Sequence, residues 1–189
     1  MAQKKIDPRV SRTCHALRSA FIELMLARGY STVSVGDIAR RANVGRSTFY
    51  LHYASKEALL RETLDNPSRG LAACVGADAV PPMLIPLLEH FREQRRINRV
   101  FFEYPLRALW VRSLAGSIES KLTGARGASR GRPLIPRSLL AMLLAETQIA
   151  LITHWVSGNA LVSAESIAQA LTASTRALLA GDGGHQRPG

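Results

Sequence analysis

The sequence is poor in cysteine and in aromatic residues. Only two cysteines, Cys14 and Cys74, occur among 189 residues, and aromatic side chains make up 6% of the chain. Two thiols are too few for the disulfide framework that a small secreted domain needs. We expect both to be ordinary buried thiols, and a disulfide or a redox-sensing pair is the alternative.

The sequence also lacks an N-terminal signal peptide. Its first residues, MAQKKIDPRVSRT, contain no apolar core, so we expect the chain to be cytoplasmic. The most apolar segment, 136–157, is interrupted by Glu146, Gln148 and His154, and a carboxylate near the centre of a bilayer is costly. We interpret this segment as a buried helix and expect no membrane partner.

Motifs for catalysis, phosphate binding and metal coordination are missing as well. The sequence has no nucleophile–base set and no glycine-rich phosphate loop. His90 and His154 do not stand at metal-ligand spacing with another His, Cys or carboxylate. We therefore expect that the protein is not an enzyme and has no catalytic residues, metal site or cofactor. We interpret the two histidines as packed or surface residues.

Positive charge is abundant but spread evenly. The net charge is +11, which favours a polyanionic partner because each bound phosphate releases counterions from its surroundings. Residues 1–66 carry a net +5 and residues 67–189 a net +6. Charge alone therefore does not locate a binding site.

Apolar spacing predicts an all-helical chain, because apolar residues recur at intervals of three and four and no alternating strand pattern competes. Gly29, Asn43 and Pro67 are expected to end three of the helices. Segments 66–70 and 123–136 are predicted to be loops, the second of them basic and mobile. The expected helices cover residues 10–28, 35–42, 46–53, 56–66, 84–97, 106–122, 136–157 and 164–180.

The second and third expected helices form a helix-turn-helix pattern. Ser34 and Asp37 have the spacing of a capping box at the start of the second helix. A small core would set the crossing of the two helices, and either Leu51 or Tyr53 would complete it. The predicted core residues are Ile38, Ala42, Val44 and Phe49.

The polar side chains around this core suit DNA. Arg46, Ser47 and Thr48 stand at the start of the third helix, where base edges come within reach in the major groove. Arg46 is the best candidate for base recognition, because Arg can bind guanine through two hydrogen bonds. We expect contacts to the sugar-phosphate backbone from Ser34, Tyr50, His52 and Lys56.

From about residue 9 to residue 60 the chain resembles the DNA-binding domain of the TetR/AcrR family. It departs from that pattern at Asn43, where the family usually has Gly, at Gly45, where Ser is frequent, and at Gly36, where many members carry a larger polar residue. The residues that carry the resemblance are Gly29, Tyr30, Thr32, Ile38, Ala39, Ala42, Val44, Thr48, Phe49, Tyr50, His52, Tyr53, Lys56 and either Leu59 or Leu60.

The resemblance implies a helix-turn-helix domain over 1–55 and a helical domain over 56–180, followed by a disordered tail over 181–189. The second domain would bind an unknown small-molecule effector and form a homodimer through its last two helices. Its C-terminal region is loosely similar to regulators of dihydroxyacetone kinase operons. Candidates for lining an effector pocket are Phe91, Phe102, Trp110 and Trp155, for which simple core packing is the alternative.

The predicted function is therefore that of a dimeric, ligand-responsive regulator of transcription that binds double-stranded operator DNA. Repression that is relieved by the effector is the expected mode. The alternative is a TetR-like coactivator or sensor that acts through protein contacts and does not bind DNA. Arg46, Tyr50 and Lys56 argue against this alternative.

Overall fold

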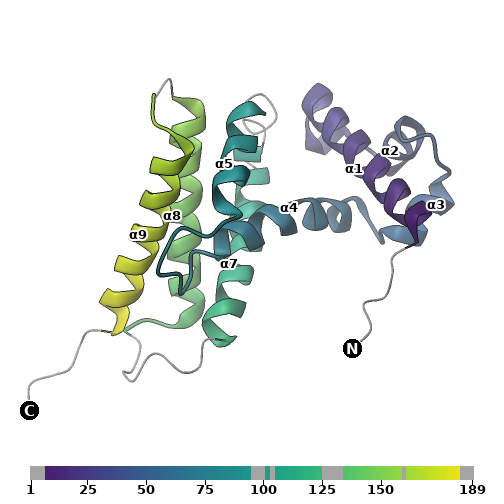
Figure 1. Cartoon of the computed structure of the whole chain (residues 1–189). Helices are drawn as coiled ribbons and strands as arrows, with labels where there is room; N and C mark the ends of the chain where they lie inside the picture. Colours follow the sequence, from purple (N-terminus) through teal and green to yellow (C-terminus); the bar gives the residue numbers. More distant parts are fainter. Residues whose placement is uncertain (1–6, 95–100, 103–104, 125–133, 159–160, 184–189) are drawn as a thin grey trace, which may run out of the picture. The chain divides into compact units, whose positions relative to one another are not determined.

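The computed structural model describes residues 7–94, 101–102, 105–124, 134–158 and 161–183, and within these ranges the chain is helical and has no strand (Figure 1). The predicted all-helical class is confirmed. The chain forms two compact units, one up to Thr63 and one from Leu64 onward.

The first unit contains α1 (Pro8–Arg28), a short 3-10 helix (Tyr30–Thr32), α2 (Val35–Arg41), α3 (Arg46–His52) and the beginning of α4 (Lys56–Ala72). The predicted ends of α1 and α2 are confirmed. Gly29 follows α1 with a φ of 77°, and Asn43 follows α2 with a φ of 55°, both in the left-handed region where these two residue types are tolerated.

The predicted end of the fourth helix at Asn66, and the predicted loop over 66–70, are wrong. Helix α4 continues through Pro67 to Ala72, although proline inside a helix removes a hydrogen bond and costs about 3 kcal/mol. Leu71 and Ala72 on this continuation are buried, and burial of a side chain as large as leucine stabilises the fold by about 1.5–3 kcal/mol. Burial of the continuation thus offsets the cost of the proline.

The second unit contains α5 (Leu84–Glu93), α7 (Leu106–Gly124), α8 (Arg137–Ser157) and α9 (Ala164–Gly183). Helix α7 packs along α8, while α9 packs against α5 and α8, so α8 and α9 lie side by side (Figure 1). His90 and His154, interpreted from the sequence as packed or surface residues, are both on the surface.

Two expected helix ends in this unit are corrected. Helix α5 ends at Glu93 and not at 97, because Gln94 has a ψ of 35°. Helix α9 extends past 180 to Gly183, so the first residues of the expected tail are helical. Positions 95–97, most of the expected basic loop (125–133) and the tail from 184 lie outside the described residues.

Helix α8 is long and apolar enough to cross a membrane, but half of its most apolar window is buried inside the second unit. The amide of Gln148 donates to the hydroxyl of Thr175 on α9 at 3.0 Å, and both residues are buried. On another side of the helix Leu139, Met142 and Leu143 are exposed. Helix α8 is thus a core helix with one apolar stripe left uncovered.

Candidate nucleic-acid interface

A capping box fixes the start of α2, as the sequence predicts. The hydroxyl of Ser34 accepts a hydrogen bond from the Asp37 amide at 3.2 Å, and the Ser34 amide donates to the Asp37 carboxylate at 3.1 Å. Hydrogen bonds from the Ser34 side chain and backbone lower the pKa of Asp37. Both polar groups of Ser34 are therefore occupied within the chain.

The turn between α2 and α3 is tight. The Val44 amide donates to the Ala39 carbonyl at 2.9 Å across the left-handed Asn43, and Gly45 is the N-cap of α3 without a side-chain cap bond. Of the predicted core, Ile38 and Phe49 are fully buried, whereas Ala42 and Val44 are half-buried. The turn holds α3 directly against α2.

Tyr53 is buried beside α3, whereas Leu51 is exposed. Tyr53, which follows α3, is 3% exposed and its ring lies 5.8 Å from the ring of Phe49. Leu51 is 82% exposed. Between the two predicted alternatives, Tyr53 completes the core and Leu51 lies on the surface of the recognition helix.

The outward side of α3 carries most of the predicted DNA contacts. Arg46 and Ser47 are exposed and Thr48 is half-buried at the start of the helix. Tyr50 is 57% exposed, and its ring packs edge-on against Phe49 at 5.5 Å. His52 is half-buried at the end of the helix. Polar side chains thus cover a helix whose opposite side is anchored by an apolar core.

The Arg46 side chain lies on the first turn of α2, against Gly36. A Cβ atom placed on Gly36 would come within 2.4 Å of Arg46 Nη2 and within 3.0 Å of its Cζ and Nε atoms. The guanidinium therefore occupies the space that a side chain at position 36 would take. Within the described part of the chain, Arg46 has no carboxylate partner.

Comparisons with known proteins agree with this geometry. Residues 17–63 match the family described as bacterial regulatory proteins, tetR family. The first unit therefore resembles the tetR family over this segment. The matched segment begins within α1 and ends within α4, and it contains the capping box, the turn and α3.

Two curated relatives differ in how much of the chain they match. YxbF of Bacillus subtilis, named as an uncharacterized HTH-type transcriptional regulator, is 45% identical over 60 residues, which are 31% of this chain and 16% of YxbF. MftR of Mycobacterium tuberculosis, named for the regulation of mycofactocin biosynthesis, is 26% identical over 186 residues, covering 89% of this chain and 92% of MftR. The chain therefore spans only a small part of YxbF.

Solved structures extend the likeness to the second unit. The crystal structure of a TetR transcriptional regulator from Streptococcus agalactiae aligns with a TM-score of 0.56 and 26% identity over 88% of this chain and 95% of that one. This alignment covers more of the chain than the tetR-family segment 17–63. The loose likeness of the C-terminal region to dihydroxyacetone kinase regulators stays a prediction.

Lys56 has a structural role in this tetR-family domain that the sequence did not reveal. Its ammonium donates hydrogen bonds to the carbonyls of Tyr30 at 2.9 Å and Val33 at 2.8 Å. It also lies 4.2 Å from the centre of the Tyr30 ring. Two of its three N–H groups are therefore used to tie α4 to the segment between α1 and α2.

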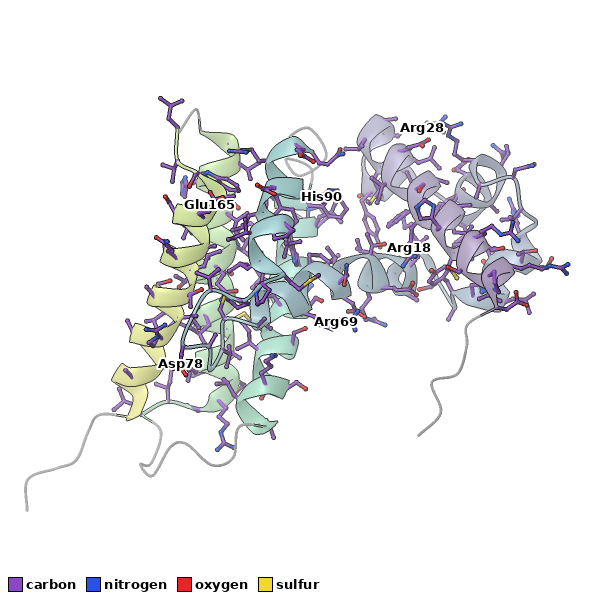
Figure 2. The ribbon with its side chains drawn as sticks, in the orientation of Figure 1. Arg18, Arg28, Arg69, Asp78, His90 and Glu165 are labelled. Carbon is purple, nitrogen blue, oxygen red and sulfur yellow. The ribbon has the colours of Figure 1, made fainter. Side chains whose placement is uncertain are left out.

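Three carboxylates of the first unit, those of Glu62, Glu57 and Glu23, bind side chains from other elements and so support α3. Arg18 of α1, labelled in Figure 2, donates to Glu62 of α4 at 3.1 Å. Glu62 also accepts from the Tyr53 hydroxyl at 3.0 Å. Burial, followed by the hydrogen bonds that the phenol makes with Cys14 and donates to Glu62, raises the pKa of Tyr53. These partners are far apart in sequence, so no local pattern could reveal them. The remaining pairs are Tyr30 with Glu57 at 3.1 Å and Arg41 with Glu23 at 2.8 Å.

Burial and the contact with Glu57 keep the Tyr30 phenol in its neutral form. Burial and then the hydrogen bond to Glu57 raise the pKa of Tyr30 to about 12. The Glu57 pKa is lowered, first by the Ser55 hydroxyl. The phenol therefore remains a donor throughout the physiological range.

The predicted effector-pocket residues divide into two groups. In the second unit the Phe102 ring stacks on Trp110 at 5.1 Å, and Phe91 meets Trp110 edge-on at 5.5 Å. The Phe101 ring joins them at 6.4 Å from the Trp110 ring. Trp155 instead donates from its indole nitrogen on α8 to the carbonyl of Val162, shortly before α9, at 3.0 Å.

Trp110 has one feature that simple core packing leaves unexplained. Its side chain is 2% exposed, and its indole N–H has no hydrogen-bond partner in the described part of the chain. A buried donor without a partner costs about 1–3 kcal/mol. This donor lies in the cluster of Phe91, Phe101 and Phe102.

Proposed function

We propose that the chain binds double-stranded operator DNA through α3 and regulates transcription as a homodimer that responds to a small-molecule effector. The observation that carries this proposal is the two-sided character of α3. Phe49 anchors the helix in the core, while Arg46 and Ser47 face solvent. A short helix held in this way fits the major groove.

The individual contacts follow from position and chemistry. Arg46 recognises guanine, and Ser47 and Thr48 reach neighbouring base edges. Tyr50 and His52 bind phosphates on either side of the groove. The exposed Leu51 offers an apolar contact to a thymine methyl group.

Ser34 and Lys56 contribute less to DNA contact than their residue types suggest. Ser34 is occupied by the capping box, and Lys56 keeps one N–H beyond its two bonds to backbone carbonyls. We propose that Lys56 binds a phosphate through this remaining donor. Its main contribution is to hold α4 to the segment between α1 and α2 through the carbonyls of Tyr30 and Val33.

The proposed homodimer forms through α8 and α9. Leu139 and Leu143 are 56% and 44% exposed on α8, and α9 presents exposed small residues such as Ala170 and Ala173. Apolar stripes at helical spacing beside small side chains suit close packing of helices from two copies. Each dimer then presents two recognition helices to two half-sites.

The proposed effector site includes Phe91, Phe102 and Trp110, while Trp155 supports it through the connection between α8 and α9. An effector with an acceptor group would satisfy the Trp110 N–H. Its binding shifts the population of dimers away from the spacing that fits DNA, which relieves repression. We propose no catalytic activity and a cytoplasmic location, in line with relatives named as transcriptional regulators.

Binding to a pool of duplexes with a randomised centre tests this proposal. Wild-type chain is expected to enrich a sequence with two related half-sites and to lose affinity steeply as salt rises. Arg46→Ala should relax the preference at one base pair in each half-site. Failure to enrich any sequence, with weak and uniform binding throughout, would favour the coactivator that acts through protein contacts.

A further inference from the structure

We propose that Gly36 is a specificity-determining position, because the space left by its missing side chain holds the guanidinium of Arg46. This inference rests on the proposed base recognition by Arg46. It extends the recognition surface from α3 to the first turn of α2. Gly36 itself touches no base; it acts by positioning Arg46.

The contact is local and close. Arg46 is the first residue of α3, and its side chain reaches back to Gly36 in the first turn of α2. Gly36 is buried although the outer residues Ser34 and Arg40 of this segment are exposed. A Cβ atom at position 36 would lie 2.4 Å from Nη2, a separation that no pair of non-bonded atoms maintains.

Charge does not explain why the guanidinium rests there. The N-terminal end of a helix carries partial positive charge, which disfavours a cation. Arg46 has no carboxylate partner within the described residues, and the Asp37 carboxylate nearby is paired with Ser34 and Arg40. In the structure the guanidinium instead lies against the bare backbone at Gly36.

This placement has a consequence for recognition. An Arg side chain loses rotamer freedom when it binds a base, and holding it beforehand saves about 2- to 12-fold in affinity. Two hydrogen bonds to guanine also require a defined approach of the guanidinium plane. A side chain at position 36 would displace Arg46 and remove both advantages.

A Cβ at position 36 would displace only the far end of the flexible Arg46 side chain. The fold of the domain should therefore tolerate Gly36→Ala. Gly36→Ala places a better helix former in α2. We expect its melting temperature to equal or exceed that of the wild type. The matched control is Gly116→Ala in α7, where an added Cβ would meet nothing within 4 Å.

The test uses full-length chain and two probes: the duplex that wild type enriches from the randomised pool, and a scrambled duplex of equal length. The ratio of the two dissociation constants measures specificity. Arg46→Ala should reduce this ratio by about 5- to 150-fold for each half-site that the dimer contacts. Gly36→Ala should reduce it by about 2- to 12-fold without changing affinity for the scrambled duplex, and Gly116→Ala should leave it unchanged.

The double variant separates this inference from the proposed function. If Gly36 acts through Arg46, then Gly36→Ala has no further effect on the ratio in the Arg46→Ala background. An unchanged or increased ratio for Gly36→Ala alone, or an equal loss in both backgrounds, overturns the inference while leaving base recognition by Arg46 intact. If Arg46→Ala itself has no effect, both the base contact and the inference are wrong.

Discussion

The ammonium of Lys56 lies 4.2 Å from the centre of the Tyr30 ring and donates to the carbonyl of the same residue at 2.9 Å. One side chain of α4 thus holds both the ring and the backbone of the segment that precedes α2. The helix-turn-helix depends on this frame for its position.

Replacing Lys56 should lower the free energy of unfolding of the chain even when no DNA is present. Lys56→Met keeps the aliphatic stem and removes two charge-assisted hydrogen bonds and the contact with the ring. We expect the free energy of unfolding to fall by about 1–3 kcal/mol, measured by urea titration. Arg61→Met, an exposed cation on the same helix, is the control, and an equal loss in both variants would rule out the bracing role.

Glu62 links three elements, and its removal should loosen them together. Arg18 and Glu62 are 38% and 44% exposed in their side chains, so the ion pair alone contributes little. The hydrogen bond from the buried Tyr53 contributes more. We expect Glu62→Gln to cost about 0.5–1.5 kcal/mol in urea unfolding. Asp65→Asn, an exposed carboxylate on the same helix, should cost almost nothing.

The capping box makes stability depend on pH in a defined direction. The pKa of Asp37 is lowered in the folded chain by its bonds with Ser34. The carboxylate therefore stabilises the fold above its ordinary pKa of about 3.9, and this contribution is lost as pH falls through the lower folded pKa. Asp37→Asn should be less stable than wild type near neutral pH, and the difference should vanish in acid. A constant difference across the range would exclude the carboxylate as the cause.

Local signals in the sequence predicted a large part of the fold. The Ser34–Asp37 spacing, the stop at Asn43 and the periodic apolar residues of α1 and α7 depend on neighbours within one or two turns. The structure confirms them. The polar side of α3 was predictable for the same reason, because burial of Phe49 fixes where Arg46 and Tyr50 lie.

Long-range packing set what the sequence could not predict. The continuation of α4 through Pro67 depends on burial of Leu71 and Ala72, which only the assembled unit supplies. The inward bonds of Lys56 likewise depend on carbonyls at positions 30 and 33. The choice of Tyr53 over Leu51 follows from the packing of Tyr53 on Phe49 and its bond to Glu62.

The proposed dimer can be tested on α8. Leu143→Arg places a charge on the exposed apolar stripe, and we expect it to shift the chain from dimer to monomer in sedimentation equilibrium. Its affinity for the enriched duplex should fall because one recognition helix then acts alone. Met83→Arg, at a side chain that is 70% exposed elsewhere in the second unit, is the control. A wild-type chain that sediments as a monomer would contradict the proposal.

We propose above all that Arg46 on α3 binds a guanine in the major groove. The most direct test of this proposal is to replace each guanine of the enriched duplex, one at a time, with 7-deazaguanine, which lacks the N7 acceptor. We predict that one position in each half-site lowers the affinity of wild type several-fold while Arg46→Ala binds both duplexes equally. Wild-type affinity that is indifferent to every such replacement, or an equal loss in Arg46→Ala, would contradict the claim.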